Sequence, residues 1–285
     1  MKTEVAYFNS REAAQILGVN VSSVKRWTDE GKLECIRTLG GHRKFMVRHL
    51  LDFLKKHRRK TSQVNLTPIE SEADLELRYH MFRRNYEALI PPIYEHAFEC
   101  HRDQLQQILN ELYLSQCPLA EIYGDILTPV LHKIGHEWEQ GRISITEEHI
   151  ATQTIRDSII RLRGIIQIPT AKIGKVLSLN LSHELHDIAL KMTEHLLETK
   201  GFEVFYSGQI TPTIHLAHVF ERYQPDRLYI SSTVAKADTT QQELDRLFAL
   251  CEAHHCEVYV GGTGFDALQY DHPAVIRRIY RFQDI

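Results

Sequence analysis

Glu184 and His186 are two side chains of one short segment that could together hold a metal. They follow an apolar run, Val176–Leu181, that predicts a buried strand. Neutral imidazole is a common metal ligand, and a carboxylate two residues away can orient it. Ligands of open α/β sheets bind beyond the carboxyl ends of the strands, so this strand-to-helix junction would lie in the ligand crevice. The segment therefore predicts a metal or cofactor site, with a histidine that binds nothing as the alternative.

A second polar group lies earlier, within a stretch rich in helix formers. Trp138 is followed by Glu148 and His149 in a segment with apolar residues at helical spacing. Taken by itself, this pattern is typical of an aromatic residue in a helical bundle and two solvated polar groups.

Positive charge is concentrated at the start of the chain. Residues 1–60 contain 14 Lys and Arg against 6 Asp and Glu, a net charge of +8, whereas the remaining residues carry −11. A basic head on an acidic body indicates a polyanion partner for the head alone, and a solvated basic surface is the alternative.

The basic head contains the pattern of a helix-turn-helix. Ser10 can cap a first helix, and Gly18 begins a tight turn before a second helix that ends at Gly31. Val24 and Trp27 face inward at a spacing of three. The residues left outward, which we expect to meet bases in the major groove of double-stranded DNA, are Ser22, Ser23, Lys25 and Arg26.

A basic hairpin follows the second helix. Gly40 and Gly41 lie between strand-like flanks and predict its tip. The residues expected at the DNA backbone or in the minor groove are Arg37, His42, Arg43 and Lys44. The segment predicts a wing beside the second helix.

The body of the chain divides into two kinds of pattern. Residues 72–168 predict a bundle of four or five helices, and strands alternate with helices after Pro169. This alternation predicts a parallel sheet with helices on both faces. The expected domains are a DNA-binding domain at 1–60, a linker at 61–71, the bundle at 72–168 and the α/β domain at 172–285.

Composition excludes several classes of protein. The five cysteines are scattered and indicate reduced thiols. No apolar run is long enough to cross a membrane, and the first residues lack the apolar core of a signal peptide. No nucleophile–base pair or cluster of metal-binding acids appears. We therefore expect a cytoplasmic protein that is not an enzyme and has no membrane partner.

Taken together, these segments resemble MerR-type B12-dependent photoreceptor repressors of the CarH and LitR type. The head carries the resemblance from Tyr7 to His57, through V-K-R-W in the second helix and G-G-H-R-K-F in the wing. The body carries it through the order of a helical bundle, a strand and E-x-H. The resemblance implies a winged helix-turn-helix, a helical bundle and a C-terminal flavodoxin-like doubly wound α/β domain. It also implies adenosylcobalamin between the bundle and the α/β domain, and a homo-oligomer, dimer or tetramer, that represses from a DNA operator and responds to light.

The resemblance also assigns roles to individual residues. Trp138, Glu148 and His149 match the motif over the upper axial face of cobalamin, and His186 matches the lower axial cobalt ligand. Glu184 would support that histidine. The full set that the resemblance assigns to the cofactor is Trp138, Glu148, His149, Glu184, His186, Asp187, Ser231, Thr233, Gly261 and Gly262.

Three positions depart from the pattern of these repressors. Ala189 replaces the glycine of E-x-H-x-x-G, and Gln209 stands where an aspartate is common. Glu139 stands where the best-described members have a second histidine that captures cobalt after illumination, so no bis-histidine light product would form through it. One alternative is a regulator of the same architecture with a lost or altered cobalamin site, controlled by another input. Another alternative is a corrinoid carrier of a methyltransferase. The DNA-binding head argues against it, because a methyl carrier has no use for a wing.

Overall fold

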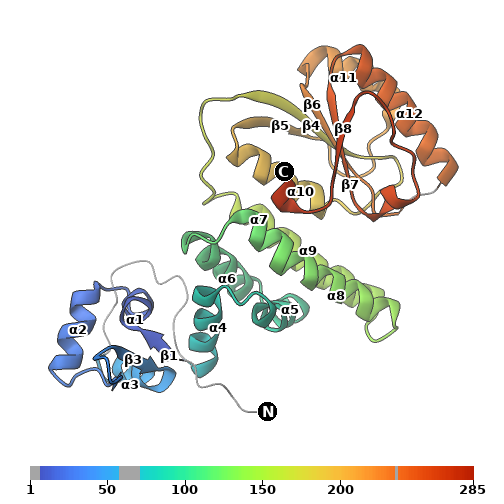
Figure 1. Ribbon diagram of the computed structural model, residues 1–285. Helices are drawn as coiled ribbons and strands as arrows, with labels where there is room; N and C mark the ends of the chain where they lie inside the picture. The colour runs from blue at the N-terminus through green and yellow to red at the C-terminus, as the bar shows by residue number, and fades with distance from the viewer. Residues whose placement is uncertain (1–6, 58–70, 235–236) are drawn as a thin grey trace. The chain divides into compact units, whose positions relative to one another are not determined.

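The computed structural model describes residues 7–57, 71–234 and 237–285 (Figure 1). The chain divides into two compact units, each of which is described by itself: Met1–Cys117 with Pro129–Thr152, and Pro118–Thr128 with Gln153–Ile285. The predicted linker lies outside the described residues except for Ser71, as do the last three residues of the predicted DNA-binding domain. The three-domain division stays a prediction. Within the described ranges, no helix has the length and apolar character needed to cross a bilayer.

The head folds as a helix-turn-helix with a wing. Its elements are β1 (Tyr7–Asn9), α1 (Ser10–Ile16), α2 (Val21–Asp29), β2 (Ile36–Arg37), β3 (Arg43–Met46) and α3 (Val47–His57). Asn9 rather than Ser10 caps α1. The Asn9 side chain accepts hydrogen bonds from the backbone amides of Arg11 and Glu12, and the Asn9 backbone amide donates to the Glu12 carboxylate. The expected cap is therefore wrong by one residue.

The remainder of the first unit is helical, as predicted. The helices of the central region are α4 (Glu72–Arg83), α5 (Ile90–Phe98), α6 (Arg102–Leu114), α8 (Thr128–Glu139) and α9 (Ile145–Leu162), with a short turn η1 (Glu87–Leu89). Helix α9 crosses the boundary between the units, because its residues from Gln153 onward belong to the second unit. Leu75 of α4 packs into the core of the head, beside Phe8 and Trp27. Arg78, also on α4, is buried and donates to Glu111 of α6 at 2.9 Å. A buried guanidinium needs such a partner, so this pair fixes α4 against α6.

The second unit contains the predicted parallel sheet. Its strands are β4 (Gly174–Asn180), β5 (Phe202–Tyr206), β6 (Arg227–Ser231), β7 (Glu257–Gly261) and β8 (Val275–Ile279), and their order across the sheet is β5-β4-β6-β7-β8. All four pairings are parallel. The doubly wound α/β fold is thus confirmed. Strand β8 was not predicted, because Arg277 and Arg278 interrupt its apolar pattern.

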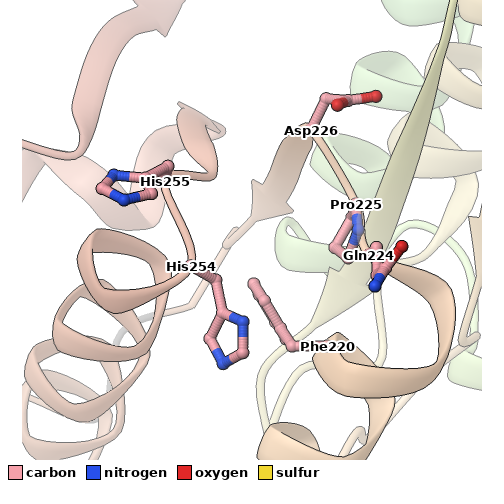
Figure 2. Close-up of a pocket in the computed structure, with 6 residues that line it drawn as sticks. All are labelled: Phe220, Gln224, Pro225, Asp226, His254 and His255. Atoms are coloured by element: carbon pink, nitrogen blue, oxygen red, sulfur yellow. The ribbon is translucent and has the colours of Figure 1, made fainter.

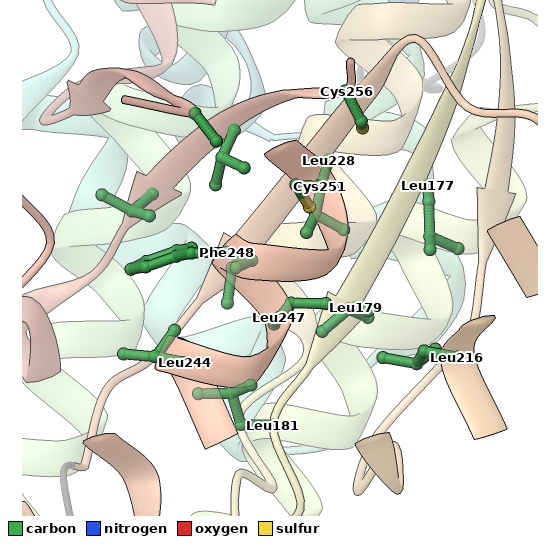
Figure 3. Packing of buried hydrophobic residues seen from close by; sticks show 14 of the residues in the cluster. Leu177, Leu179, Leu181, Leu216, Leu228, Leu244, Leu247, Phe248, Cys251 and Cys256 are labelled. Carbon is green, nitrogen blue, oxygen red and sulfur yellow. The ribbon is translucent and has the colours of Figure 1, made fainter. Parts of the chain in front are cut away.

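Helices cover both faces of this sheet (Figure 1). They are α10 (Ile188–Thr199) on one face and α11 (Leu216–Tyr223) with α12 (Ala237–Ala253) on the other, α11 being preceded by a short turn η3 (Thr213–His215). Figure 3 shows the α12 face, where Leu177 and Leu179 of β4 pack with Leu247 and Phe248. Alternate residues of β4 point to opposite faces. Val176, Ser178 and Asn180 therefore share the α10 face.

A π-helical segment, η2 (Ile122–Leu127), lies between α7 (Leu119–Glu121) and α8. Its Tyr123 is buried, and the tyrosine hydroxyl lies 2.7 Å from Nδ1 of His195, a buried residue of α10. Burial lowers the pKa of His195 to about 4, so this imidazole is neutral in the folded protein. Tyr123 thus fixes η2 to the α10 side of the sheet.

Candidate DNA interface and candidate cofactor site

The outer face of α2 carries the predicted base-reading residues. Val24 and Trp27 are buried in the core of the head, and Trp27 packs on Phe53 with ring centroids 4.8 Å apart. The opposite face is solvent-accessible: Ser22, Lys25 and Arg26 are exposed and Ser23 is half-buried. A short amphipathic helix with hydroxyls and cations on its free face has the chemistry that direct readout in the major groove requires.

The wing is a tight hairpin. The amide of Thr38 donates to the carbonyl of His42 at 2.9 Å, and the amide of Gly41 donates to the carbonyl of Thr38 at 2.9 Å. Gly41 has a φ of 77°, a conformation that side-chain-bearing residues rarely adopt. His42 and Lys44 are exposed beside the tip. Both side chains are accessible, and their contact with phosphates stays a prediction.

Two of the residues predicted to contact DNA are also engaged with the end of α2, and their contact with DNA stays a prediction. Nη2 of Arg43 lies 2.7 Å from Oδ1 of Asp29, and Nη2 of Arg37 lies 2.6 Å from the same oxygen. These hydrogen bonds, led by that from Arg43, hold the pKa of Asp29 below its ordinary value. Only 16% of the Arg43 side chain is exposed. Asp29, which no local pattern in the sequence marks, therefore joins the wing to the second helix.

The second unit carries the candidate ligand His186 in the loop between β4 and α10. Helix α10 starts only at Ile188, so His186 lies outside it. The physical reason is Glu184, whose Oε1 accepts from the backbone amide of His186 at 2.9 Å and from Nδ1 of its ring at 2.6 Å. These bonds hold His186 in the loop outside the helix. Its side chain is 62% exposed.

Glu184 is the centre of this loop. Its side chain is 3% exposed, and Oε2 accepts from the amides of Thr233 at 2.5 Å and Val234 at 3.1 Å. Burial raises the pKa of Glu184, but the bonds from His186, Thr233 and Val234 outweigh it, so the net pKa lies below the ordinary value. An ionised carboxylate can only accept, so Nδ1 of His186 carries a proton, and in the neutral imidazole Nε2 would then be the nitrogen that carries the lone pair. That is the tautomer a histidine needs to bind a metal through Nε2.

Asp187 is held inside the unit. Its carboxylate accepts from Arg156 of α9, from the hydroxyl of Tyr206 and from Nε2 of Gln209. The glutamine at position 209, where related sequences commonly have an aspartate, has a physical reason. Its side-chain amide donates a hydrogen bond to Asp187, whereas an ionised carboxylate at this position could not donate and would repel Asp187. Asn180 donates to the carbonyl of His186 at 2.9 Å. Asn180 could have been found from the sequence, because it is a polar residue at the end of a buried strand. Nothing local in the sequence marks Arg156.

Small and polar residues line the α10 face at the carboxyl ends of the strands. Asn180, Ser231 and Gly261 are register partners on β4, β6 and β7. Oγ of Ser178 and Oδ1 of Asn180 are buried and have no hydrogen-bond partner among the described residues. A buried polar atom without a partner calls for an explanation, such as an ordered water or a bound ion.

Gly262 is required by the protein itself. Its φ is 93°, and a Cβ at this position would lie 2.2 Å from the carbonyl oxygen of Ser232. The glycine therefore allows the loop after β7 to approach the loop after β6. Thr263 donates to the carbonyl of Thr233 at 3.3 Å and joins the same two loops. A role for Gly262 in leaving room for a nucleotide tail stays a prediction.

The candidate upper-face residues lie in the first unit. Trp138, near the end of α8, is 45% exposed, and His149 on α9 is exposed beside Glu148. Nε2 of His149 lies 3.4 Å from Oε2 of Glu148, and Oε1 of Glu148 accepts from the hydroxyl of Thr152 at 2.8 Å. These side chains are accessible on their helices, as an external ligand would need.

A hollow of about 370 Å³ lies elsewhere on the sheet (Figure 2). Its lining residues are Phe220, Gln224, Pro225, Asp226, His254 and His255. Asp226 directly precedes β6, so the hollow is at the amino ends of the strands, opposite the end that carries His186. It is separate from the candidate cofactor site.

Comparison with known proteins supports both halves of this description. Residues 7–58 match the family model of a helix-turn-helix domain, and residues 90–163 match that of a B12 binding domain. The HTH-type transcriptional repressor CarH of Myxococcus xanthus is 24% identical over 281 residues, covering 94% of this chain and 91% of that protein. The monomethylamine corrinoid protein of Methanosarcina barkeri has a similar fold, with a TM-score of 0.57 and 12% identity over 70% of this chain and 95% of that one.

The fold and the matched domains define a class of protein. A winged helix-turn-helix precedes a B12 binding domain and a parallel α/β sheet in one chain. The protein is a DNA-binding, B12-sensing transcriptional regulator.

Proposed function

We propose that this regulator is a repressor that senses adenosylcobalamin, and light through it, by a change in oligomeric state. The observation that carries the proposal is the contact between Glu184 and His186, which presents Nε2 of an accessible imidazole as a metal ligand. The likeness to a CarH repressor over 94% of the chain supports the same reading. The proposal gives the chain a regulatory role in the cytoplasm and no reaction of its own.

The residues present fit a cobalamin bound through histidine. Glu184 would orient the ring of His186, and the unpartnered Ser178 and Asn180 atoms provide polar positions at the strand ends. Ser231, Thr233, Gly261 and Gly262 surround the same end of the sheet, and Trp138, Glu148 and His149 would cover the upper face. Asp187 would act through the loop rather than by contact. Bound adenosylcobalamin would supply a cobalt–carbon bond that light can break.

The affinity of the DNA-binding domain for its operator would then depend on the cofactor and oligomeric state of the rest of the chain. Ser22, Ser23, Lys25 and Arg26 would read bases, while His42 and Lys44 would contact phosphates and Arg37 and Arg43 would hold the wing. One head makes few contacts, so several heads on one operator gain affinity from their high effective concentration. A ligand that favours one oligomer would thereby change repression.

One experiment tests the proposal directly. The purified protein is mixed with adenosylcobalamin in darkness, and its absorption spectrum, size and operator binding are measured before and after illumination. We expect a bound spectrum, a change in size on illumination and a matching change in DNA affinity. No spectral change on mixing would favour the regulator with a lost cobalamin site, and binding without any response to light would remove the photoreceptor part.

Two variants in one loop test whether His186 is the cobalt ligand. His186→Ala should abolish the spectrum of the bound form or weaken binding on the order of 100-fold. His183→Ala is the matched control, because His183 is exposed in the same loop and lies three residues away. Equal effects of the two variants would remove His186 from the site.

A further inference from the structure

The carboxylate of Asp187 is gripped by side chains from separate elements. Oδ2 accepts from Nη2 of Arg156 and from the hydroxyl of Tyr206, both at 2.8 Å. Oδ1 accepts from Nε of Arg156 at 3.3 Å and from Nε2 of Gln209 at 3.2 Å. The Asp187 side chain is 3% exposed. The backbone directly after His186 is therefore fixed to α9 and to the loop that follows β5.

The backbone before His186 is held by the same neighbours. Nε2 of Gln209 donates to the carbonyl of Leu185 at 2.6 Å, and the amide of Ile210 donates to the carbonyl of Glu184 at 3.3 Å. A loop that is already ordered in this way loses little conformational entropy when it binds a ligand.

Because Asp187 is buried, losing its ion pair with Arg156 would destabilise the loop. The Asp187 side chain is almost fully shielded from water, and Arg156 and Tyr206 donate hydrogen bonds to its carboxylate. Without the guanidinium, a buried charge would remain with no counter-charge, and the loop would move to solvate it.

We propose that Arg156 and Gln209 are positioning residues that set the geometry of His186 through Asp187. The inference rests on the proposed function, because it concerns the ligand that His186 would provide. Helix α9 also carries Glu148 and His149, two turns before Arg156.

Two variants break the grip in different ways. Arg156→Gln removes the charge and the bidentate contact. Gln209→Glu keeps the size of the side chain but places a carboxylate 3.2 Å from Oδ1 of Asp187 and removes the donor to Leu185. Gln209 is exposed, so this second variant should fold even if the first does not.

Arg163→Gln is the matched control. Arg163 makes a bidentate contact of the same kind, to Glu198 of α10 at 2.6 and 2.8 Å, away from the loop of residues 182–187. For all three variants, the dissociation constant for adenosylcobalamin and the spectrum of the bound form are measured in darkness. We expect Arg156→Gln and Gln209→Glu to weaken binding on the order of 10- to 100-fold, with spectra shifted towards that of His186→Ala. Arg163→Gln should retain the original affinity and spectrum.

Unchanged affinity and spectrum in Arg156→Gln and Gln209→Glu would overturn the inference, as would an equal loss in Arg163→Gln. If the unaltered protein binds no cobalamin, the proposed function fails, and amide hydrogen exchange of the ligand-free protein decides the positioning role. Faster exchange of residues 182–187 in the two variants, but not in Arg163→Gln, would support it. Unchanged exchange would refute it.

Discussion

Nδ1 of His186 lies 2.6 Å from Oε1 of Glu184, and the other oxygen of this buried carboxylate accepts two backbone amides from the loop after β6. One side chain thus sets both the tautomer of the imidazole and the place of a neighbouring loop.

Glu184→Gln should weaken cobalamin binding on the order of 10-fold, because a neutral amide holds the Nδ1 proton less strongly. Titration of the protein with cobalamin, followed by absorption, measures the effect. Glu203→Gln, at an exposed position of β5, is the control and should leave the affinity unchanged. The same affinity in both variants would show that Glu184 does not support the ligand.

Lys44→Ala and Arg43→Ala should weaken DNA binding in different ways. Lys44 is exposed, so its loss should reduce the slope of log affinity against log salt by about 0.9. Arg43 is engaged with Asp29, so its loss should weaken binding with the slope retained. Operator titrations at several salt concentrations separate the two results. A reduced slope for Arg43→Ala would show that Arg43 contacts phosphate.

His195 should make the second unit less stable in mild acid. Burial lowers its folded pKa to about 4 from an ordinary 6.5, so only the unfolded chain takes up the proton between these values. Stability is therefore fully present above pH 6.5, falls as the pH drops towards 4 and loses at most about 3 kcal/mol. Denaturation followed by circular dichroism between pH 4 and 7.5 measures this change.

His195→Gln should reduce that dependence on pH, although it also removes the partner of Tyr123 and lowers stability at neutral pH. His218→Gln, at an exposed position of α11, should leave the dependence unchanged. A pH profile of His195→Gln parallel to that of the unaltered protein would contradict the assignment.

Gly262→Ala should destabilise the fold by at least about 3 kcal/mol, because the added methyl would overlap the carbonyl oxygen of Ser232. Gly208→Ala is the control. It has a similar φ of 87° with nothing within 4 Å, so it carries only the conformational cost of about 1 kcal/mol. Equal losses in the two variants would mean that the loops can move apart.

Much of the fold was predictable because its signals are local. The spacing of Val24 and Trp27 marks the inner face of α2, and short continuous apolar runs mark the buried strands β4, β6 and β7. These patterns follow from the periods of helices and strands, which each segment expresses by itself. Strand β8 escaped prediction because its arginines hide the period.

The sequence alone therefore determined the helix-turn-helix, the wing, the parallel sheet and the pairing of Glu184 with His186, two residues apart. Tertiary structure decided which charges are engaged. Asp29 forms an ion pair with Arg43, and Arg156 forms one with Asp187, which is 31 positions away in the chain. Contacts of this range depend on how whole elements pack, and no local period records them.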